Sequence, residues 1–309
     1  KQIPSNQYNV RQPSIDHLFP RKTQMKFPLC ILFAGILTSH AEDILFRDSF
    51  DRADSLNIDA SLTGITDNTG SALAADAVYT HAWIDPNNAP PSYGTQDAVA
   101  GNGGGARILT NRLQLAVGAG TSNAFVNHNF VNPAIIAAGG FSVSLDVTGY
   151  TQTGYQQGGA FAIGMSQAEA ASCTDAFNVN PAMSGAFSDL STVGAAVLGG
   201  VRSDFWVALR GNNSLVWGGR TGTIQGVTGL AAKTGTVSVK FTFPSFTQGT
   251  QVNYQVFLNA VSRGSGSFVW SGTGKNFIGL DARDSGGVNL DNLNVSTIEP
   301  TPVAALAVS

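Results

Sequence analysis

Several segments of the chain alternate apolar and polar residues with a period of two, which is the pattern of a strand with one buried face. In residues 141–147, Phe, Val, Leu and Val alternate with Ser, Ser and Asp, and residues 237–243 show the same alternation. Leu113–Val117 alternates in the same way, and further strands are expected at Phe161–Met165, Phe205–Leu209, Val252–Asn259, Asn276–Leu280 and Val288–Val295. These segments predict an all-β fold, a two-sheet antiparallel jelly-roll sandwich with roughly eleven to fourteen strands.

One segment predicts a short helix instead. Ser166 and Glu169 have the S-x-x-E spacing of a capping box, ahead of Ala170 and Ala171. Glu169 is also the only Glu between Glu42 and Glu299. Its position is therefore explained by a backbone cap, without a catalytic role.

The N-terminal region predicts export. Residues 25–41, MKFPLCILFAGILTSHA, have the charged start, apolar run and small-residue end of a secretory signal peptide, with cleavage before Glu42. We interpret residues 1–24 as sequence upstream of the true start, residues 42–298 as one β-sandwich domain, and residues 299–309 as a C-terminal tail. The expected location is secreted, extracellular or at the cell surface.

The charge of the predicted mature chain excludes some partners. From Glu42 to Ser309 there are twelve Lys and Arg residues and nineteen Asp and Glu residues, a net charge of −7. Nucleic acids and anionic membranes require clustered positive charge, so neither is the expected partner. The mature chain also contains no apolar run of about 20 residues, so we expect no integral membrane span.

The sequence offers no clear catalytic pair of carboxylates. A glycosidase needs two carboxylates at a defined separation, but Glu42 and Glu299 lie near the ends of the mature chain. Asp146 and Asp204 each occur singly on different predicted strands. This distribution favours a protein without catalytic activity.

The predicted hairpin of residues 205–220 suggests a ligand surface. If its loop has two or four residues, Trp206 and Trp217 share one face of the sheet, beside Arg210. Exposed indoles beside polar groups suit sugar binding, because the apolar face of a pyranose packs on them. Alternatively, both Trp residues belong to the core, and a three-residue loop would place them on different faces.

Acidic residues near the two ends of the domain suggest a calcium site. Asp48 falls on the apolar face of its predicted strand, where an ionised carboxylate needs a partner. In the last strand the apolar phase slips at Asp291 and Asn292, which predicts a β-bulge. Asp48, Asp51, Asp291 and Asn292 are therefore candidate ligands of calcium, which takes six to eight oxygens. The alternative is that these side chains cap turns.

Several strand patterns resemble those of exported bacterial proteins of the concanavalin A-like, laminin-G-like jelly-roll group. The segments that carry the resemblance are residues 46–54, 140–146, 278–281 and 288–295. Some such proteins end in a Pro-Glu-Pro sorting signal, and residues 298–302 are similar to it but lack the complete motif. The resemblance implies a fold and does not identify catalytic residues.

Taken together, these features predict a secreted or cell-surface protein that binds a polysaccharide or cell-surface glycan without catalysis. Two alternatives remain: an extracellular polysaccharide lyase or glycoside hydrolase with an unrecognised site, and a purely structural surface protein. Fold alone does not decide between them.

Overall fold

The computed structural model describes residues 42–54, 78–80, 107–115, 122–127, 133–150, 158–166, 169, 203–272, 274, 277–282 and 288–299. These residues all belong to one compact unit, residues 39–309. The predicted upstream segment 1–24, the predicted signal peptide 25–41 and residues 300–309 of the predicted tail lie outside the described residues.

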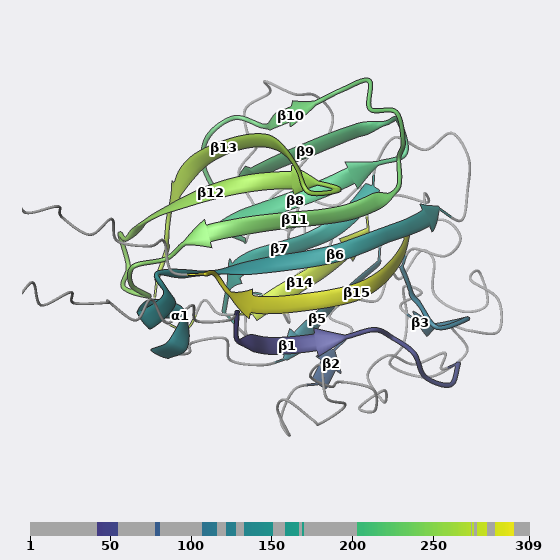
Figure 1. The fold of residues 1–309 in the computed structure, drawn as a ribbon, viewed down its shortest axis with the longest axis horizontal. Coiled ribbons are helices and arrows are strands. Elements are labelled where there is room, and N and C mark those ends of the chain that lie inside the picture. The colour runs from purple at the N-terminus through teal and green to yellow at the C-terminus, as the bar shows by residue number, and fades with distance from the viewer. Residues whose placement is uncertain are drawn as a thin grey trace, which may run out of the picture. The chain divides into compact units, whose positions relative to one another are not determined.

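The described chain folds into two antiparallel β-sheets (Figure 1). The first sheet has eight strands, in the order β13-β12-β11-β6-β15-β4-β3, with β1 also paired to β15. Its strands are β1 (Ile44–Asp48), β3 (Arg107–Ile108), β4 (Leu113–Leu115), β6 (Gly140–Tyr150), β11 (Gly235–Thr242), β12 (Gln251–Leu258), β13 (Val261–Val269) and β15 (Val288–Thr297). The all-β sandwich predicted from the alternating pattern is confirmed.

The second sheet has seven strands, in the order β10-β9-β8-β7-β14-β5-β2. They are β2 (Val78–Thr80), β5 (Ser122–Asn127), β7 (Gly158–Met165), β8 (Phe205–Arg210), β9 (Ser214–Gly219), β10 (Gln225–Val227) and β14 (Phe277–Ala282). Every residue of β7 and β8 is buried, so these two strands are covered on both faces. The sequences of these two strands therefore lack the alternation of apolar and polar residues seen in β6 and β11.

The hydrophobic core lies between the two sheets. In β6 and β11 the apolar residues of the alternating pattern are buried and their polar neighbours point away from the core. Core side chains from β6 and β11 include Phe141, Val143, Leu145, Val237, Val239 and Phe241. They meet Phe205, Val207, Leu209 and Trp217 of the second sheet in the same cluster. At about 25 cal/mol per Å² of apolar surface removed from water, this burial is the main stabilising contribution.

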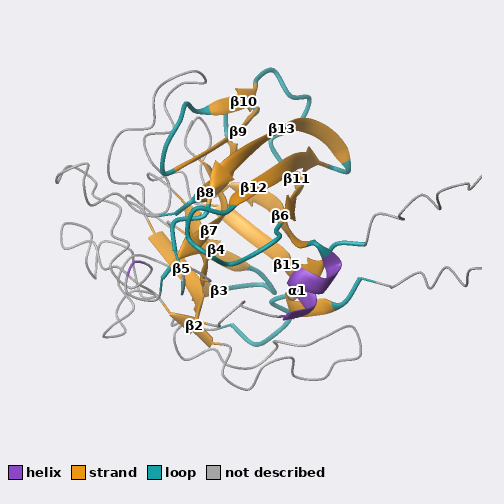
Figure 2. Ribbon diagram, turned by 90° about the vertical axis from the view of Figure 1, so that its left-hand side faces the viewer, coloured by secondary structure: helices purple, strands orange, loops and turns teal. Residues whose placement is uncertain are grey.

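One short helix, α1 (Pro133–Ala138), lies beside β6 and β15 (Figure 2). The sequence signal for it was missed: Pro133 occupies the first helical position, where its fixed φ suits the helix and its missing N–H costs nothing.

The capping box at Ser166 is confirmed, since Ser166 N–H donates to Glu169 Oε2 at 2.9 Å and Glu169 N–H donates to Ser166 Oγ at 3.2 Å. In the part of the chain that the structure describes, no helix is long and apolar enough to cross a membrane.

A close approach between the sheets depends on Gly264 of β13. A Cβ atom placed there would lie 2.4 Å from Cζ2 of Trp217, so β13 accommodates this indole only because residue 264 has no side chain. We expect Gly264→Ala to lower the free energy of unfolding by about 1–3 kcal/mol, as overpacking does in other cores. Chemical denaturation measures this change in the free energy of unfolding. Gly149→Ala is the control, because a Cβ at Gly149 makes only an ordinary 3.5 Å contact. Equal stability of the two variants would contradict this packing.

Candidate functional site

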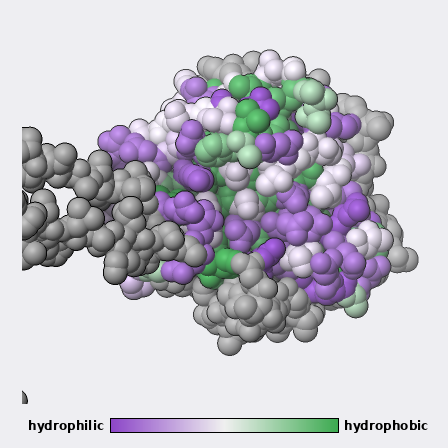
Figure 3. Space-filling model, viewed as in Figure 1, coloured by the Kyte–Doolittle hydropathy of each residue, from purple (hydrophilic) through white to green (hydrophobic). Residues whose placement is uncertain are grey.

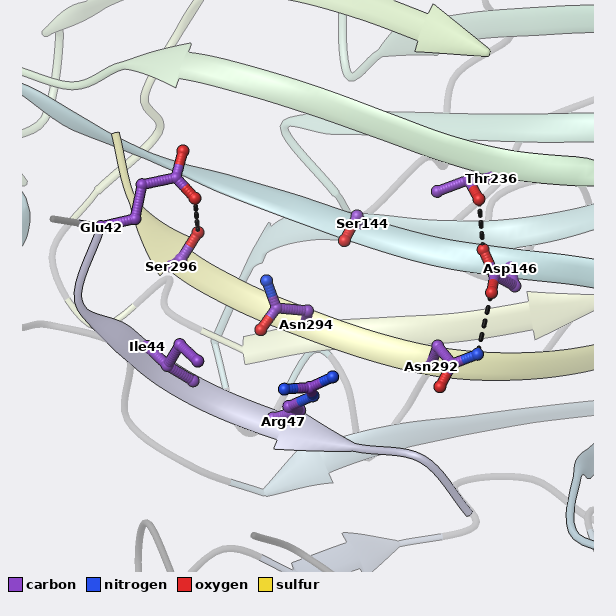
Figure 4. A pocket seen from close by; sticks show the side chains of 9 residues that line it. All are labelled: Glu42, Ile44, Arg47, Ser144, Asp146, Thr236, Asn292, Asn294 and Ser296. Atoms are coloured by element: carbon purple, nitrogen blue, oxygen red, sulfur yellow. Dashed lines mark hydrogen bonds between the residues drawn. The ribbon is translucent and has the colours of Figure 1, made fainter. Parts of the chain in front are cut away.

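A polar groove with a volume of about 360 Å³ lies on the outer face of the first sheet (Figure 4). Hydrophilic residues gather on this side of the molecule over β1, β15 and β6 (Figure 3). The side chains that line the groove are mostly hydroxyl, amide, carboxylate and guanidinium groups: Glu42, Ile44, Arg47, Ser144, Asp146, Thr236, Asn292, Asn294 and Ser296. Such a mixture offers both donors and acceptors to a polyhydroxylated ligand.

Strand register places these residues in rows across the sheet. Arg47 of β1 pairs with Asn294 of β15, and Asn294 pairs with Ser144 of β6. Residues opposite each other on antiparallel strands have side chains on the same face, with Cβ atoms about 4.5–5.5 Å apart. Three strands from distant parts of the sequence thus present guanidinium, amide and hydroxyl groups side by side.

The predicted β-bulge in the last strand shapes one end of the groove. The register of β15 against β6 shifts between Asp291 and Asn294, and Asn292 has a φ of 49°. The slip aims the Asn292 amide at Asp146, whose Oδ2 accepts from Asn292 Nδ2 at 2.9 Å. The other carboxylate oxygen of Asp146 accepts from the hydroxyl of Thr236. The bulge that the sequence predicted is confirmed, and both oxygens of Asp146 have partners.

Glu42 lies at the opposite end of the groove from Asp146 (Figure 4). Ser296 Oγ donates to Glu42 Oε2 at 3.4 Å, and the hydroxyls of Ser296 and Ser142 are hydrogen-bonded at 2.9 Å. Ser142 and Asp146 are four residues apart on β6, or about 13 Å along an extended strand. The two carboxylates of the groove are therefore held at its two ends.

The middle of the groove has hydrogen-bonding groups that the described protein does not use. Arg47 is partly buried, and within the described part of the chain its guanidinium makes no hydrogen bond or ion pair. Beside it, the Asn294 amide lines the groove, although its Oδ1 is buried and accepts no hydrogen bond from the described residues. In contrast, Arg52 and Arg220 are paired with carboxylates elsewhere in the described structure. The guanidinium of Arg47 thus remains available to a ligand in the groove.

The predicted pair of exposed Trp residues is wrong in its geometry. The hairpin pairs Arg210 with Ser214, which leaves a three-residue loop in which Asn213 has a φ of 62°. Trp217 then lies opposite Val207 and faces the core, while Trp206 lies opposite Gly218 on the other face. Trp206 is 0% exposed and Trp217 4% exposed, so neither presents an indole to solvent. Arg210, on the face of Trp206, is buried as well.

The predicted calcium ligands occupy the expected strands without forming a recognisable metal site. Asp48 is 0% exposed, and its Oδ1 accepts from Phe50 N–H and from Arg52 Nη1, both at 2.7 Å. The cost of burying this carboxylate is thus met by hydrogen bonds and an ion pair. Among the described residues, no three His, Cys, Asp or Glu side chains are arranged to hold a metal ion. Calcium binding by Asp48, Asp51, Asp291 and Asn292 stays a prediction.

Asp291 lies among other acidic groups near the bulge. Its pKa is raised, chiefly by burial, while the backbone N–H of Asn292 lowers it through a 2.8 Å hydrogen bond. The negative charges of Asp51 and Asp146 raise it further, and Arg112 acts in the opposite direction. Asp291 is not among the residues that line the groove.

A second charged cluster lies at the ends of β7, β8 and β9 in the second sheet. Asp204 is 1% exposed and accepts from Arg220 Nε at 3.0 Å and from the backbone N–H of Ser271 at 2.8 Å. Arg220 also contacts Glu169 at 3.3 Å. Burial raises the pKa of Asp204, which the hydrogen bonds from Ser271 and the charge of Arg220 partly oppose. The ion pair and hydrogen bonds of the nearly fully buried Asp204 thus link the start of β8 to the residues that follow β9 and β13.

From the sequence, Asp146 is a lone carboxylate on its strand and Asn292 a candidate calcium ligand, and the groove that they line is not predicted. Arg47, Ser144, Asn294 and Ser296 all stand at polar positions of alternating strands, which was the available signal. Their convergence depends on the pairing of β1 with β15, about 250 residues apart in sequence, and on the pairing of β15 with β6. Neither pairing follows from the alternation alone.

Comparison with known proteins gives only distant likenesses. No protein-family model matches the sequence, and no curated protein does. Among solved structures, one domain of AbnA, an extracellular arabinanase from Geobacillus stearothermophilus in complex with arabinotriose, covers 85% of this chain and 96% of its own, with 15% identity and a TM-score of 0.37. The lectin UEA-II in complex with galactose covers 72% and 93%, with 10% identity and a TM-score of 0.35. LamAcat from Zobellia galactanivorans covers 83% and 98%, with 8% identity and a TM-score of 0.33. These values establish no family for this chain.

Proposed function

We propose that this chain is a secreted or cell-surface protein that binds a glycan in the polar groove of the first sheet, without catalysis. The observation that carries the proposal is the set of groups in the groove, where four strands and Glu42, two residues before β1, present hydroxyl, amide, guanidinium and carboxylate side chains. Sugar hydroxyls both donate and accept, so they match such a set.

The position of the carboxylates supports binding over hydrolysis. Canonical glycosidases hold two carboxyl groups about 5–9.5 Å apart, on the two sides of the bond to be cleaved. Glu42 and Asp146 lie at opposite ends of the groove (Figure 4). Ser142, whose hydroxyl is bonded to the Ser296 that contacts Glu42, is four residues or about 13 Å along β6 from Asp146. Asp146 is further engaged by Thr236 and Asn292 through both oxygens.

The proposal is tested with Asn294→Ala and a panel of glycans. We expect this variant to bind its glycan about three- to tenfold more weakly, as for the loss of one hydrogen bond from the amide that lines the groove, while its melting temperature changes little, since the Asn294 Oδ1 accepts no hydrogen bond from the described residues. Glycan arrays identify the ligand, and isothermal titration calorimetry measures the change.

The matched control is Asn253→Ala. Asn253 is an exposed Asn on β12 of the same sheet, outside the groove. Its replacement should leave binding unchanged. A reducing-sugar assay and an assay for unsaturated products accompany the measurement. Products would favour the lyase or hydrolase. The absence of both binding and products would favour a structural surface protein.

A further inference from the structure

We propose that the ligand of the groove is a glycan that contains uronic acid, and that Arg47 binds its carboxylate. This inference rests on the proposed function and goes beyond it by naming the ligand class and the residue that selects it. It follows from the juxtaposition of Arg47 with Asn294 in the middle of the groove (Figure 4).

Arg47 is a charged donor whose backbone is fixed by the β1–β15 pairing. Its side chain lines the groove and makes no hydrogen bond or ion pair within the described part of the chain. A partly buried guanidinium loses part of its hydration, which the polar atoms of a ligand can replace. Its planar fork of donors matches the two oxygens of a carboxylate, which it can bind through two parallel hydrogen bonds.

The neighbours of Arg47 specify what lies beside that carboxylate. Asn294 lines the groove next to Arg47, and Ser144 on the next strand adds a hydroxyl. The Ser144 hydroxyl both donates and accepts, so it matches a ligand hydroxyl beside the carboxylate that Arg47 binds. The groove therefore fits an anionic group with a hydroxyl next to it, the arrangement that a uronic acid ring presents.

The ends of the groove restrict how much negative charge the ligand carries. Glu42 and Asp146 stand on the two sides of Arg47, so the guanidinium of Arg47 lies between two carboxylates (Figure 4). A polymer with an anionic group on every residue would place negative charge against both acids, and like charges so placed are repelled. This favours a glycan in which uronic acid alternates with a neutral sugar over a densely sulfated one.

The experiment compares two forms of one oligosaccharide by calorimetry with the full chain. The probe alternates glucuronic acid with a neutral sugar, and its counterpart has the carboxyl groups reduced to alcohols. We expect the wild type to bind the acidic form about tenfold more tightly, and Arg47→Gln to abolish that preference by weakening only the acidic form. Arg47→Lys keeps the charge but lacks the planar guanidinium. Its preference for the acidic form should therefore lie between those of the wild type and Arg47→Gln.

Lys240→Gln is the control for non-specific attraction. Lys240 is an exposed cation on β11 of the same sheet, outside the groove, so its loss should leave the preference intact. Equal binding of both forms by the wild type, equal loss of both in Arg47→Gln, or tighter binding of a sulfated polysaccharide would each overturn the inference. In the first two of these outcomes the neutral form still binds in the groove, so the proposed function stands. If no glycan binds at all, the proposed function fails as well.

Discussion

Replacing Trp217 by alanine is expected to lower the free energy of unfolding by about 3–5 kcal/mol, the usual range for truncating a large aromatic residue in a core. Trp217 is 4% exposed and belongs to the core cluster that joins the two sheets. Its indole reaches across to β13, where Gly264 leaves room for it. Removal would leave a cavity at this point, because the strands on both sides are fixed by their hydrogen-bonded partners.

Urea denaturation measures the change in the free energy of unfolding, and Gln225→Ala is a matched control. Gln225 of β10 pairs directly with Trp217 in the second sheet, but its side chain is exposed. Its replacement should change stability by no more than about 0.5 kcal/mol. A Trp217→Ala variant with wild-type stability and weakened glycan binding would contradict the core position and favour the exposed Trp pair expected from the sequence.

The first sheet could be predicted from the sequence because its strands have one buried and one solvated face. In β6, β11 and β15 the alternation of apolar and polar residues gave the direction of each side chain correctly. The phase slip at Asp291 and Asn292 gave the bulge, because one extra residue in a strand reverses the alternation beyond it. These features are local, so a single sequence contains them.

The second sheet could not be predicted in the same detail. β8 is buried on both faces, so the alternation that distinguishes inside from outside is absent. The relative position of Trp206 and Trp217 then depends on one loop residue. With Asn213 in the left-handed region the loop has three residues, and the two indoles face opposite ways.

The groove lies beyond sequence reasoning for a different reason. Its central row consists of Arg47, Asn294 and Ser144, each an ordinary polar residue on the solvent face of a strand. None of them has the spacing of a motif. They become a site only through the order and register of β1, β15 and β6, which are long-range properties of the fold.

The expected effect of Asp48→Ala is a loss of about 3–5 kcal/mol of stability, because it breaks a buried ion pair by removing one partner. The Arg52 and Asp48 side chains are 6% and 0% exposed, and their atoms approach to 2.7 Å. The variant would leave the Arg52 charge without this carboxylate and the Phe50 N–H without its acceptor. Chemical denaturation measures the loss. The double variant Asp48→Ala, Arg52→Leu should recover part of it, since it removes both charges together.

The same position decides the calcium prediction. If calcium bound at Asp48, Asp51, Asp291 and Asn292, it would stabilise the folded state by mass action, so a chelator would lower the melting temperature and added calcium would restore it. If protein groups such as Arg52 and the Phe50 N–H satisfy Asp48, the melting temperature is indifferent to both reagents. Asp48→Asn separates the two cases. It removes any calcium response if Asp48 is a ligand, whereas under the ion-pair interpretation it destabilises the protein equally with and without the chelator. The 2.7 Å contact between Asp48 and Arg52 favours the second result, because a cation held at this carboxylate would compete with the guanidinium already bound to it.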